Sequence, residues 1–273
     1  MQTILMIMVI NKKRCGNMKA RIPDSKSWAE KRMEEIEKLM EHPLNADDKF
    51  SFRCKQCGAC CRDRNDILLS PFDIYRMAKQ LDKLPEDVIY DYGYVYIGQT
   101  SKIPLVSLKM RADNNECPFL KNGRCKIHKG KPAACALFPL GRFAARENEN
   151  NVSISYILQP VDCGARDEEH TVREWMRGFD LEESEQYFFV WQDKAMKLSE
   201  RMNKILDDIP PRVQEMVINQ ITHFIYACYD VEKPIMPQFE RNWSYTELLL
   251  NTIKNKLAEL IIGDKNEKDT NSV

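Results

Sequence analysis

The segment Cys54-Lys-Gln-Cys57-Gly-Ala-Cys60-Cys61 decides what kind of domain this chain forms. Its two-residue gaps let one tight turn aim successive thiolates at a single point, as in the metal-binding loops of ferredoxins and zinc knuckles. Gly58 permits the turn. The adjacent pair Cys60-Cys61 is different, because neighbouring side chains in an extended segment point to opposite sides. Either one of these two thiols is not a ligand, or the site holds more than one metal.

Further cysteines follow at Cys117-Pro118, Cys125, Cys135 and Cys163-Gly164. A cysteine before proline presents its thiolate at the end of an extended dipeptide, which is common at cluster ligands. The candidate metal ligands are eight thiols: Cys54, Cys57, Cys60, Cys61, Cys117, Cys125, Cys135 and Cys163. Eight exceed the four that one tetrahedral zinc ion or one 4Fe–4S cluster requires. The surplus thiols support the ligands, carry redox chemistry or bind a second metal.

We expect residues 54–61 and 117–135 to converge in space, because neither set alone supplies a comfortable four-ligand shell. His128, at Cys-x-x-His spacing from Cys125, is an alternative ligand. No other catalytic pattern competes with the cysteines, since the sequence contains no GxSxG elbow, HExxH motif, P-loop or glycine-rich dinucleotide fingerprint.

Composition favours a cytoplasmic protein without a membrane segment. The 273 residues carry 41 basic and 41 acidic side chains, so no global field indicates nucleic acid or membrane as a partner. The apolar run near the N-terminus precedes its basic residues, the reverse of a secretory signal, and is too short to span a bilayer. In a reducing cytosol, clustered thiols are metal ligands or redox centres rather than disulfides. Cys228 stands apart and is interpreted as a core thiol.

The stretch from Cys117 to Arg146 holds seven basic residues and no acidic one. Thiolate ligands leave a metal site with net negative charge, which nearby cations stabilise while lowering thiol pKa values. The same stretch is also suited to an anionic substrate, or forms a solvated basic loop. These alternatives stay open at this stage.

Periodicity predicts a mainly α protein around a small, loop-rich α+β cysteine-cluster core with short antiparallel strands, followed by a C-terminal helical bundle or wrap. Capping patterns at Ser27, Ser70 and Ser244 mark helix starts, and Pro85 opens a short helix. Alternating or β-branched runs at 93–98, 103–110 and 152–158 predict strands. Tyr90, Tyr92, Tyr94 and Tyr96 would share one face if that whole run were extended, as core packing or as an aromatic wall.

These patterns divide the chain by sequence position. The expected regions are 1–22 as a frayed or artefactual N-terminus, 23–49 as an N-terminal helix, 50–165 as the metal-binding domain, 166–262 as a helical region and 263–273 as a disordered tail.

The order CxxCxxCC, then CPFL at residues 117–120, CxIH at 125–128, KPxxC at 131–135 and Phe138-Pro139-Leu140 resembles the YkgJ-type cysteine-cluster family. This family has eight cysteines and is described as zinc- or iron-chelating. The resemblance covers about residues 50–165. His128, Lys131 and Ala136 stand where relatives commonly have tyrosine, arginine and a basic residue. The resemblance implies metal binding, and some relatives are named flagellin lysine N-methylases.

Three functions are consistent with these features. The first is an iron–sulfur protein, with a 4Fe–4S cluster, acting in electron transfer or another redox step with a protein or redox partner. The second is a structural zinc module that binds a protein partner. The third, an enzyme resembling the flagellin lysine N-methylases, follows from the family analogy alone.

Overall fold

The computed structural model describes residues 38–64, 66–148, 151–179 and 181–270. It forms two compact units. The cysteine unit comprises the chain up to Arg64 together with Arg111–Lys126 and Ala133–Phe189, and the helical unit comprises Asn65–Met110, Ile127–Pro132 and the chain from Val190 onward. The expected N-terminal helix lies mostly outside the described residues, where residues 38–40 are helical and the chain turns at 41.

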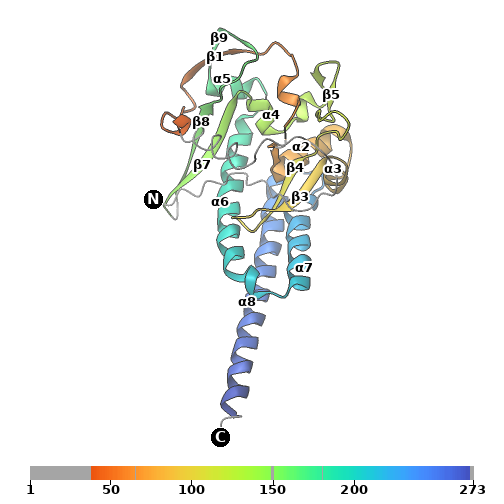
Figure 1. The fold of residues 1–273 in the computed structure, drawn as a ribbon, viewed down its shortest axis with the longest axis vertical. Coiled ribbons are helices and arrows are strands. Elements are labelled where there is room, and N and C mark those ends of the chain that lie inside the picture. Colours follow the sequence, from red (N-terminus) through yellow and green to blue (C-terminus); the bar gives the residue numbers. More distant parts are fainter. Residues whose placement is uncertain (1–37, 65, 149–150, 180, 271–273) are drawn as a thin grey trace. The chain divides into compact units, whose positions relative to one another are not determined.

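The cysteine unit is built from short elements. Its strands pair as three two-stranded antiparallel sheets, β1-β9, β5-β6 and β7-β8 (Figure 1). Its elements are β1 (Lys49–Arg53), η1 (Ala59–Cys61), β5 (Leu120–Lys121), β6 (Arg124–Cys125), α4 (Ala133–Leu137), β7 (Leu140–Asn148), β8 (Asn151–Leu158), β9 (Ala165–Thr171) and α5 (Val172–Arg177). The strand predicted at 152–158 is β8. Strands β1, β7 and β9 were not expected from the sequence.

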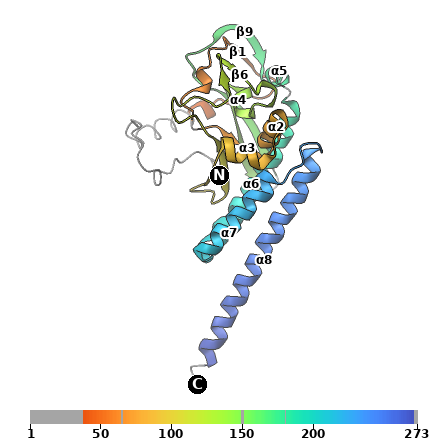
Figure 2. The same cartoon turned by 90° about the vertical axis from the view of Figure 1, so that its right-hand side faces the viewer.

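The helical unit combines a three-stranded sheet, ordered β2-β4-β3, with several helices. Its elements are β2 (Leu68–Leu69), α2 (Pro71–Leu81), α3 (Pro85–Tyr92), β3 (Gly93–Ile97), β4 (Pro104–Leu108), η2 (His128–Gly130), η3 (Leu206–Asp208), α7 (Pro211–Thr222), the π-helical η4 (His223–Ala227) and α8 (Ile235–Thr270). Helix α6 (Glu182–Ile205) begins in the cysteine unit and ends in the helical unit. Helix α8 runs back alongside α7, and its C-terminal part extends far past the start of α7 (Figure 2).

The helix expected after Ser70 and the strands expected at 93–98 and 103–110 form for the predicted reasons. Helix α2 opens with a complete capping box, in which Ser70 Oγ accepts from the Asp73 amide and the Asp73 carboxylate accepts from the Ser70 amide. Strands β3 and β4 pair antiparallel, with Val95 opposite Val106. The four tyrosines do not share one face, because Tyr90 and Tyr92 belong to α3.

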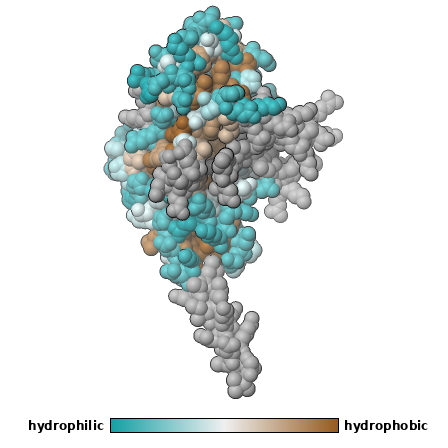
Figure 3. All heavy atoms as spheres, turned by 90° about the vertical axis from the view of Figure 1, so that its left-hand side faces the viewer, coloured by the Kyte–Doolittle hydropathy of each residue, from teal (hydrophilic) through white to brown (hydrophobic). Residues whose placement is uncertain are grey.

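The core of the cysteine unit forms where β1 meets β8, α4 and α5. Strand β1 alternates between exposed and buried positions, so Phe50 and Phe52 both point inward. They pack with Leu137, Tyr156 and Met176. Strand β9 is mostly polar and exposed, and hydrophilic residues predominate at the upper end of the face seen in Figure 3.

Several C-terminal expectations differ from the structure. Ser244 does not cap a helix: it lies inside α8, where its hydroxyl donates to the Glu240 carbonyl at 2.9 Å. The helix starts earlier because no proline or glycine interrupts residues 238–262. It continues past Gly263 to Thr270, where a disordered tail was expected, since a single glycine costs a helix only about 1 kcal/mol. The start of the helical region is also later, because residues 166–171 belong to β9.

The fold class is otherwise confirmed: the chain is largely helical, with small antiparallel sheets and a helical C-terminal region. The units do not follow the contiguous ranges expected from the sequence, because residues 65–110 pack with the C-terminal helices. Phe72 of α2, for example, lies 5.1 Å from Phe239 of α8 between ring centroids. No helix in the described ranges combines the length and apolar character needed to cross a bilayer.

Substituting Ser70 by Ala is expected to lower the free energy of unfolding of the helical unit by about 1 kcal/mol, because it removes the hydroxyl that accepts from the Asp73 amide and donates to the Asp73 carboxylate. Urea unfolding followed by circular dichroism measures the change. The control is Thr252→Ala, which removes an exposed hydroxyl bonded only within α8 to the Leu248 carbonyl and should change stability by less than half as much. Equal losses from both variants would contradict the capping role.

Candidate metal centre

The antiparallel pairing of β1 with β9 brings the first and last candidate ligands to the same end of a sheet. Arg53, the last residue of β1, is opposite Ala165, the first residue of β9. Cys54 directly follows Arg53, and Cys163 stands two residues before Ala165. Between them, Gly164 has φ +79° and lies so close to the Phe52 ring that a Cβ would be 2.3 Å from its Cε2 atom. Glycine is required here for both reasons.

The loop from Cys54 to Cys61 is a tight turn that ends in a single 3₁₀ turn. Gly58 has φ +71°, and the Cys61 amide donates to its carbonyl at 3.0 Å. Because η1 is not extended, Cys60 and Cys61 do not point apart as the sequence suggested: their sulfurs are 4.0 Å from each other. The Gln56 amide donates to the Cys54 sulfur at 3.4 Å.

This loop is fastened to the segment that carries Cys117. The Cys117 amide donates to the Cys61 carbonyl at 2.8 Å, and Arg62 Nε donates to Glu116 Oε1 at 2.8 Å. A Cβ on Gly58 would lie 3.3 Å from the Leu120 side chain. The expected convergence of residues 54–61 with the region of Cys117 is therefore present in the structure.

A hairpin with a two-residue turn then brings the chain back to the first cysteine loop. Asn122 and Gly123 both have positive φ values, 51° and 73°, as the type I′ turn requires. Leu120 pairs with Cys125 across the hairpin, and the Leu120 amide donates to the Cys117 carbonyl at 3.0 Å. The turn lies against the first cysteine loop, since a Cβ on Gly123 would be 3.6 Å from the Gln56 carbonyl oxygen.

The pKa values of several thiols are raised because the thiols lie close to one another. A hydrogen bond with Cys60 raises the pKa of Cys61 most, followed by burial, and the charges of Cys117 and Cys135 raise it further. Cys135, on α4, is therefore close enough to Cys61 for the charges of the two thiols to interact.

Two further thiols show the same effect. Burial is the main cause that raises the pKa of Cys163, and Cys57, Cys60 and Cys54 add to it. Burial also raises the pKa of Cys117, which Cys125 raises further and the Arg111 guanidinium opposes. Since a metal binds the thiolate, binding must displace protons from these thiols.

The donor set fits a thiolate-held metal in its chemistry, because every candidate is a soft sulfur ligand. The exposure of the thiols is graded: Cys54 and Cys57 are exposed, while Cys117 is buried. Within the described ranges, no three Cys, His, Asp or Glu side chains are already gathered closely enough to enclose one ion. The thiols are therefore near one another but spread over a larger volume than a single ion fills.

Two residues singled out from the sequence belong to the helical unit. His128 belongs to η2 of the helical unit, where burial, and then Lys131, lower its pKa. Cys228 is half-buried at the end of η4, and its carbonyl accepts a 2.7 Å hydrogen bond from Asn242. It is thus only partly the core thiol that was expected.

Two arginines that fix the cysteine segments were missed. Arg111 Nη2 donates to the Pro118 and Leu120 carbonyls at 3.1 and 3.0 Å, which holds the loop after Cys117. Arg62 Nη1 donates to the Cys57 carbonyl at 3.3 Å. Both also contact Glu116. No sequence pattern predicts such contacts, because an arginine can bind backbone carbonyls at any separation along the sequence.

Comparison with known proteins agrees with the site. Residues 53–155 match the family model CxxCxxCC, described as "Putative zinc- or iron-chelating domain". This confirms the resemblance to the cysteine-cluster family over these residues. The matched range ends before Cys163, so its position beside the first loop is what supports this thiol as a ligand. No curated protein and no solved structure matches this chain.

Substituting Gly58 by Ala is expected to destabilise the cysteine unit by about 1–2 kcal/mol, because a residue with a Cβ is strained at positive φ, and to weaken metal retention. Titration with a chelator, together with urea unfolding, measures both effects. Gly178→Ala is the control, since Gly178 has φ −59° and its nearest Cβ contact would be an ordinary 3.4 Å. Unchanged metal retention in Gly58→Ala would contradict a role for this turn in shaping the site.

Proposed function

We propose that this cysteine-cluster domain holds an iron–sulfur cluster, of the 4Fe–4S type, and that the protein acts in electron transfer or another redox step. The observation that carries the proposal is the position of Cys163 against the CxxCxxC loop. Together they supply four neighbouring thiols, Cys54, Cys57, Cys60 and Cys163, whose first three have ferredoxin-like spacing. Such a cluster, when bound, supplies one-electron exchange.

The distribution of the thiols supports a cluster over a single ion. In a cluster each cysteine binds a different iron atom, so the ligands stand further apart than around one ion. This agrees with the absence of a tight three-ligand group among the described residues. The Gln56 amide on Cys54 Sγ is a contact of the kind that sets cluster potentials. The chain's own residues thus hold the ligands, tune one of them and fix the loops through Arg62 and Arg111.

One observation favours the second candidate, a structural zinc module. Tetrahedral zinc with Zn–S bonds of about 2.3 Å has sulfur atoms roughly 3.8 Å apart. The Cys60–Cys61 separation of 4.0 Å is close to this value. A zinc ion at this pair would organise the loops for binding a protein partner without redox chemistry.

For the redox function we propose an acidic protein partner. The β5-β6 hairpin carries Lys121, Arg124 and Lys126, all exposed, and none of them has an ion-pair partner among the described residues. The hairpin turn contacts the loop between the exposed thiols Cys54 and Cys57. A basic surface beside the solvent-facing edge of a cluster would steer an acidic partner to the point where electrons leave.

We further propose that the protein works in the cytoplasm. The nine cysteines in the described part of the chain are free thiols. Free, clustered thiols persist in a reducing compartment.

Protein purified without oxygen is expected to be brown, to contain iron and sulfide, and to bleach with dithionite or air. Cys57→Ser should lose most of the absorbance, because a hydroxyl is a much poorer iron ligand than a thiolate. Cys228→Ser should retain it. Metal analysis and an absorption spectrum check both variants. Colourless protein with stoichiometric zinc after iron-replete, anaerobic expression would overturn the redox proposal and favour the zinc module.

Reversing the hairpin charges (Lys121→Glu, Arg124→Glu, Lys126→Glu) is expected to slow electron exchange with a reduced, acidic plant-type ferredoxin by roughly 10- to 100-fold at low ionic strength. It should also flatten the salt dependence of the rate. Stopped-flow spectroscopy measures this on protein whose cluster content has been determined.

The control for this test is Lys79→Glu, Lys254→Glu, Lys256→Glu, three exposed lysines of the helical unit whose reversal changes the net charge equally. Equal rates for the two triple variants would refute the docking surface while leaving the cluster assignment intact.

A further inference from the structure

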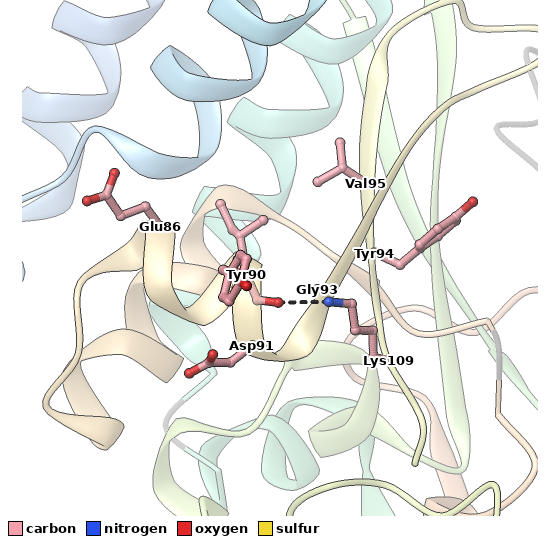
Figure 4. A pocket seen from close by; sticks show the side chains of 8 residues that line it. Glu86, Tyr90, Asp91, Gly93, Tyr94, Val95 and Lys109 are labelled. Atoms are coloured by element: carbon pink, nitrogen blue, oxygen red, sulfur yellow. Dashed lines mark hydrogen bonds between the residues drawn. The ribbon is translucent and has the colours of Figure 1, made fainter. Parts of the chain in front are cut away.

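Strand β3 is the outer strand of the β2-β4-β3 sheet, and no strand of the described chain pairs with its free edge. Gly93 at the start of the strand is buried, whereas Tyr94 and Val95 are exposed. An open depression of about 720 Å³ lies beside the start of β3, between α3 and the strand (Figure 4). Val95 at the centre of the strand is 38% exposed and Tyr94 is 57% exposed.

The hydrogen-bond register shows which backbone groups face this edge. The Lys109 amide donates to the Tyr92 carbonyl, and the Gly98 amide donates to the Ile103 carbonyl. In an antiparallel pair, hydrogen-bonded residues alternate along the strand. Tyr94 and Tyr96 therefore bond to β4, whereas Gly93, Val95 and Ile97 direct their backbone groups outward. Pro104 opposite Ile97 agrees with this register, because proline has no amide to donate.

Among the residues that the structure describes, only the Gly93 amide of these outward groups has a partner, the Ile89 carbonyl at the end of α3. The Gly93 carbonyl and both backbone groups of Val95 and Ile97 make no other backbone bond within the described residues. They form a regular row of donors and acceptors, which is a template for another strand.

The strand also lacks the features that normally protect an edge. Residues 92–101 contain no charged side chain and no proline, and β3 has no bulge. Tyr94 and Val95 project to opposite sides of the strand (Figure 4). On the tyrosine side, Tyr94 and Tyr96 stack with ring centroids 5.9 Å apart.

We propose that β3 pairs antiparallel with β3 of a second copy of this chain, about a two-fold axis at Val95. In this arrangement each Val95 donates to and accepts from its counterpart, and each Ile97 amide donates to the Gly93 carbonyl of the other copy. The pairing needs four hydrogen bonds and leaves the Gly93 amide, already bonded to Ile89, undisturbed.

The chemistry of the strand selects a second copy as the occupant. The two-fold places Tyr94 opposite Tyr96 of the other copy, in non-hydrogen-bonded pairs with Cα atoms about 4.5 Å apart, where aromatic side chains contact best. The stacked pair on each strand thus becomes a four-ring ladder. Residues near a two-fold axis contact the same residues of the other copy. None within three positions of Val95 carries a charge, so no like charges face each other there. The chain's net charge of +0 adds no long-range repulsion.

The interface is small. Pairing of two five-residue strands buries less than the roughly 1,200 Å² of a stable standard interface. The expected dimer is therefore weak, with a Kd of about 10–100 µM.

Sedimentation equilibrium of the full chain under reducing, oxygen-free conditions tests the proposal from about 1 to 500 µM. The wild type should shift from monomer to dimer. Val95→Lys and Val95→Glu should each remain monomeric, since like charges would face each other at the axis. Their equimolar mixture should dimerise again, because the pair becomes opposite in charge. Val213→Lys is the matched control, as Val213 is 40% exposed on α7, and should dimerise like the wild type.

A wild type that is monomeric throughout, dimerisation unaffected by Val95→Lys, or failure of the folded mixture to recover would each overturn the proposal. Circular dichroism establishes that the variants are folded. Hydrogen exchange of the wild type provides a second measurement that needs no variant. The Val95 and Ile97 amides should exchange at least several-fold more slowly at 500 µM than at 1 µM, and equal rates would also overturn the proposal.

Discussion

The antiparallel pairing of β1 with β9 is the constraint on which the metal centre depends. Arg53 pairs with Ala165, so the pairing closes a loop that contains all eight candidate cysteines. Closing a loop of this length costs about 4 kcal/mol of chain entropy on the logarithmic scale. Burial of Phe50 and Phe52, at roughly 1.5–3 kcal/mol each, offsets a cost of this size. The sheet thus holds the cysteine segments within reach of one another.

Within that closed loop, the chain passes between the two units at residues 64/65, 110/111, 126/127 and 132/133, and a fifth passage at 189/190 lies outside the loop. Several of these crossings adjoin candidate ligands: Arg64 is three residues after Cys61, Lys126 follows Cys125, and Ala133 is two residues before Cys135. Fixing the thiols on a metal therefore also fixes the ends of the segments that fold into the helical unit. In this way a metal site built by one unit restricts the unfolded conformations of the other.

The sequence predicted those features whose signal is local. The Ser70 capping box, the short helix at Pro85 and the β3-β4 strands each depend on residues a few positions apart, and each formed. The cysteine spacing likewise indicated the loop at 54–61. The β1-β9 sheet was missed because Ala165–Thr171 is mostly polar and charged, so its pairing shows no hydrophobic alternation. Its stability comes from Phe50 and Phe52 on the opposite strand, more than a hundred residues away in sequence.

The same distinction explains which site residues could be named in advance. Thiols are recognisable ligands wherever they occur, so all eight were candidates before any geometry was known. Arg62, Arg111 and Gly164 were not, because what makes them necessary is their neighbours: two backbone carbonyls for Arg111 and the Phe52 ring for Gly164. The arrangement of Cys60 and Cys61 depends on φ and ψ values that place them in a 3₁₀ turn, whereas the sequence argument assumed an extended pair. Identifying ligands therefore needed only residue chemistry, while predicting their grouping required the backbone conformation, which tertiary contacts set.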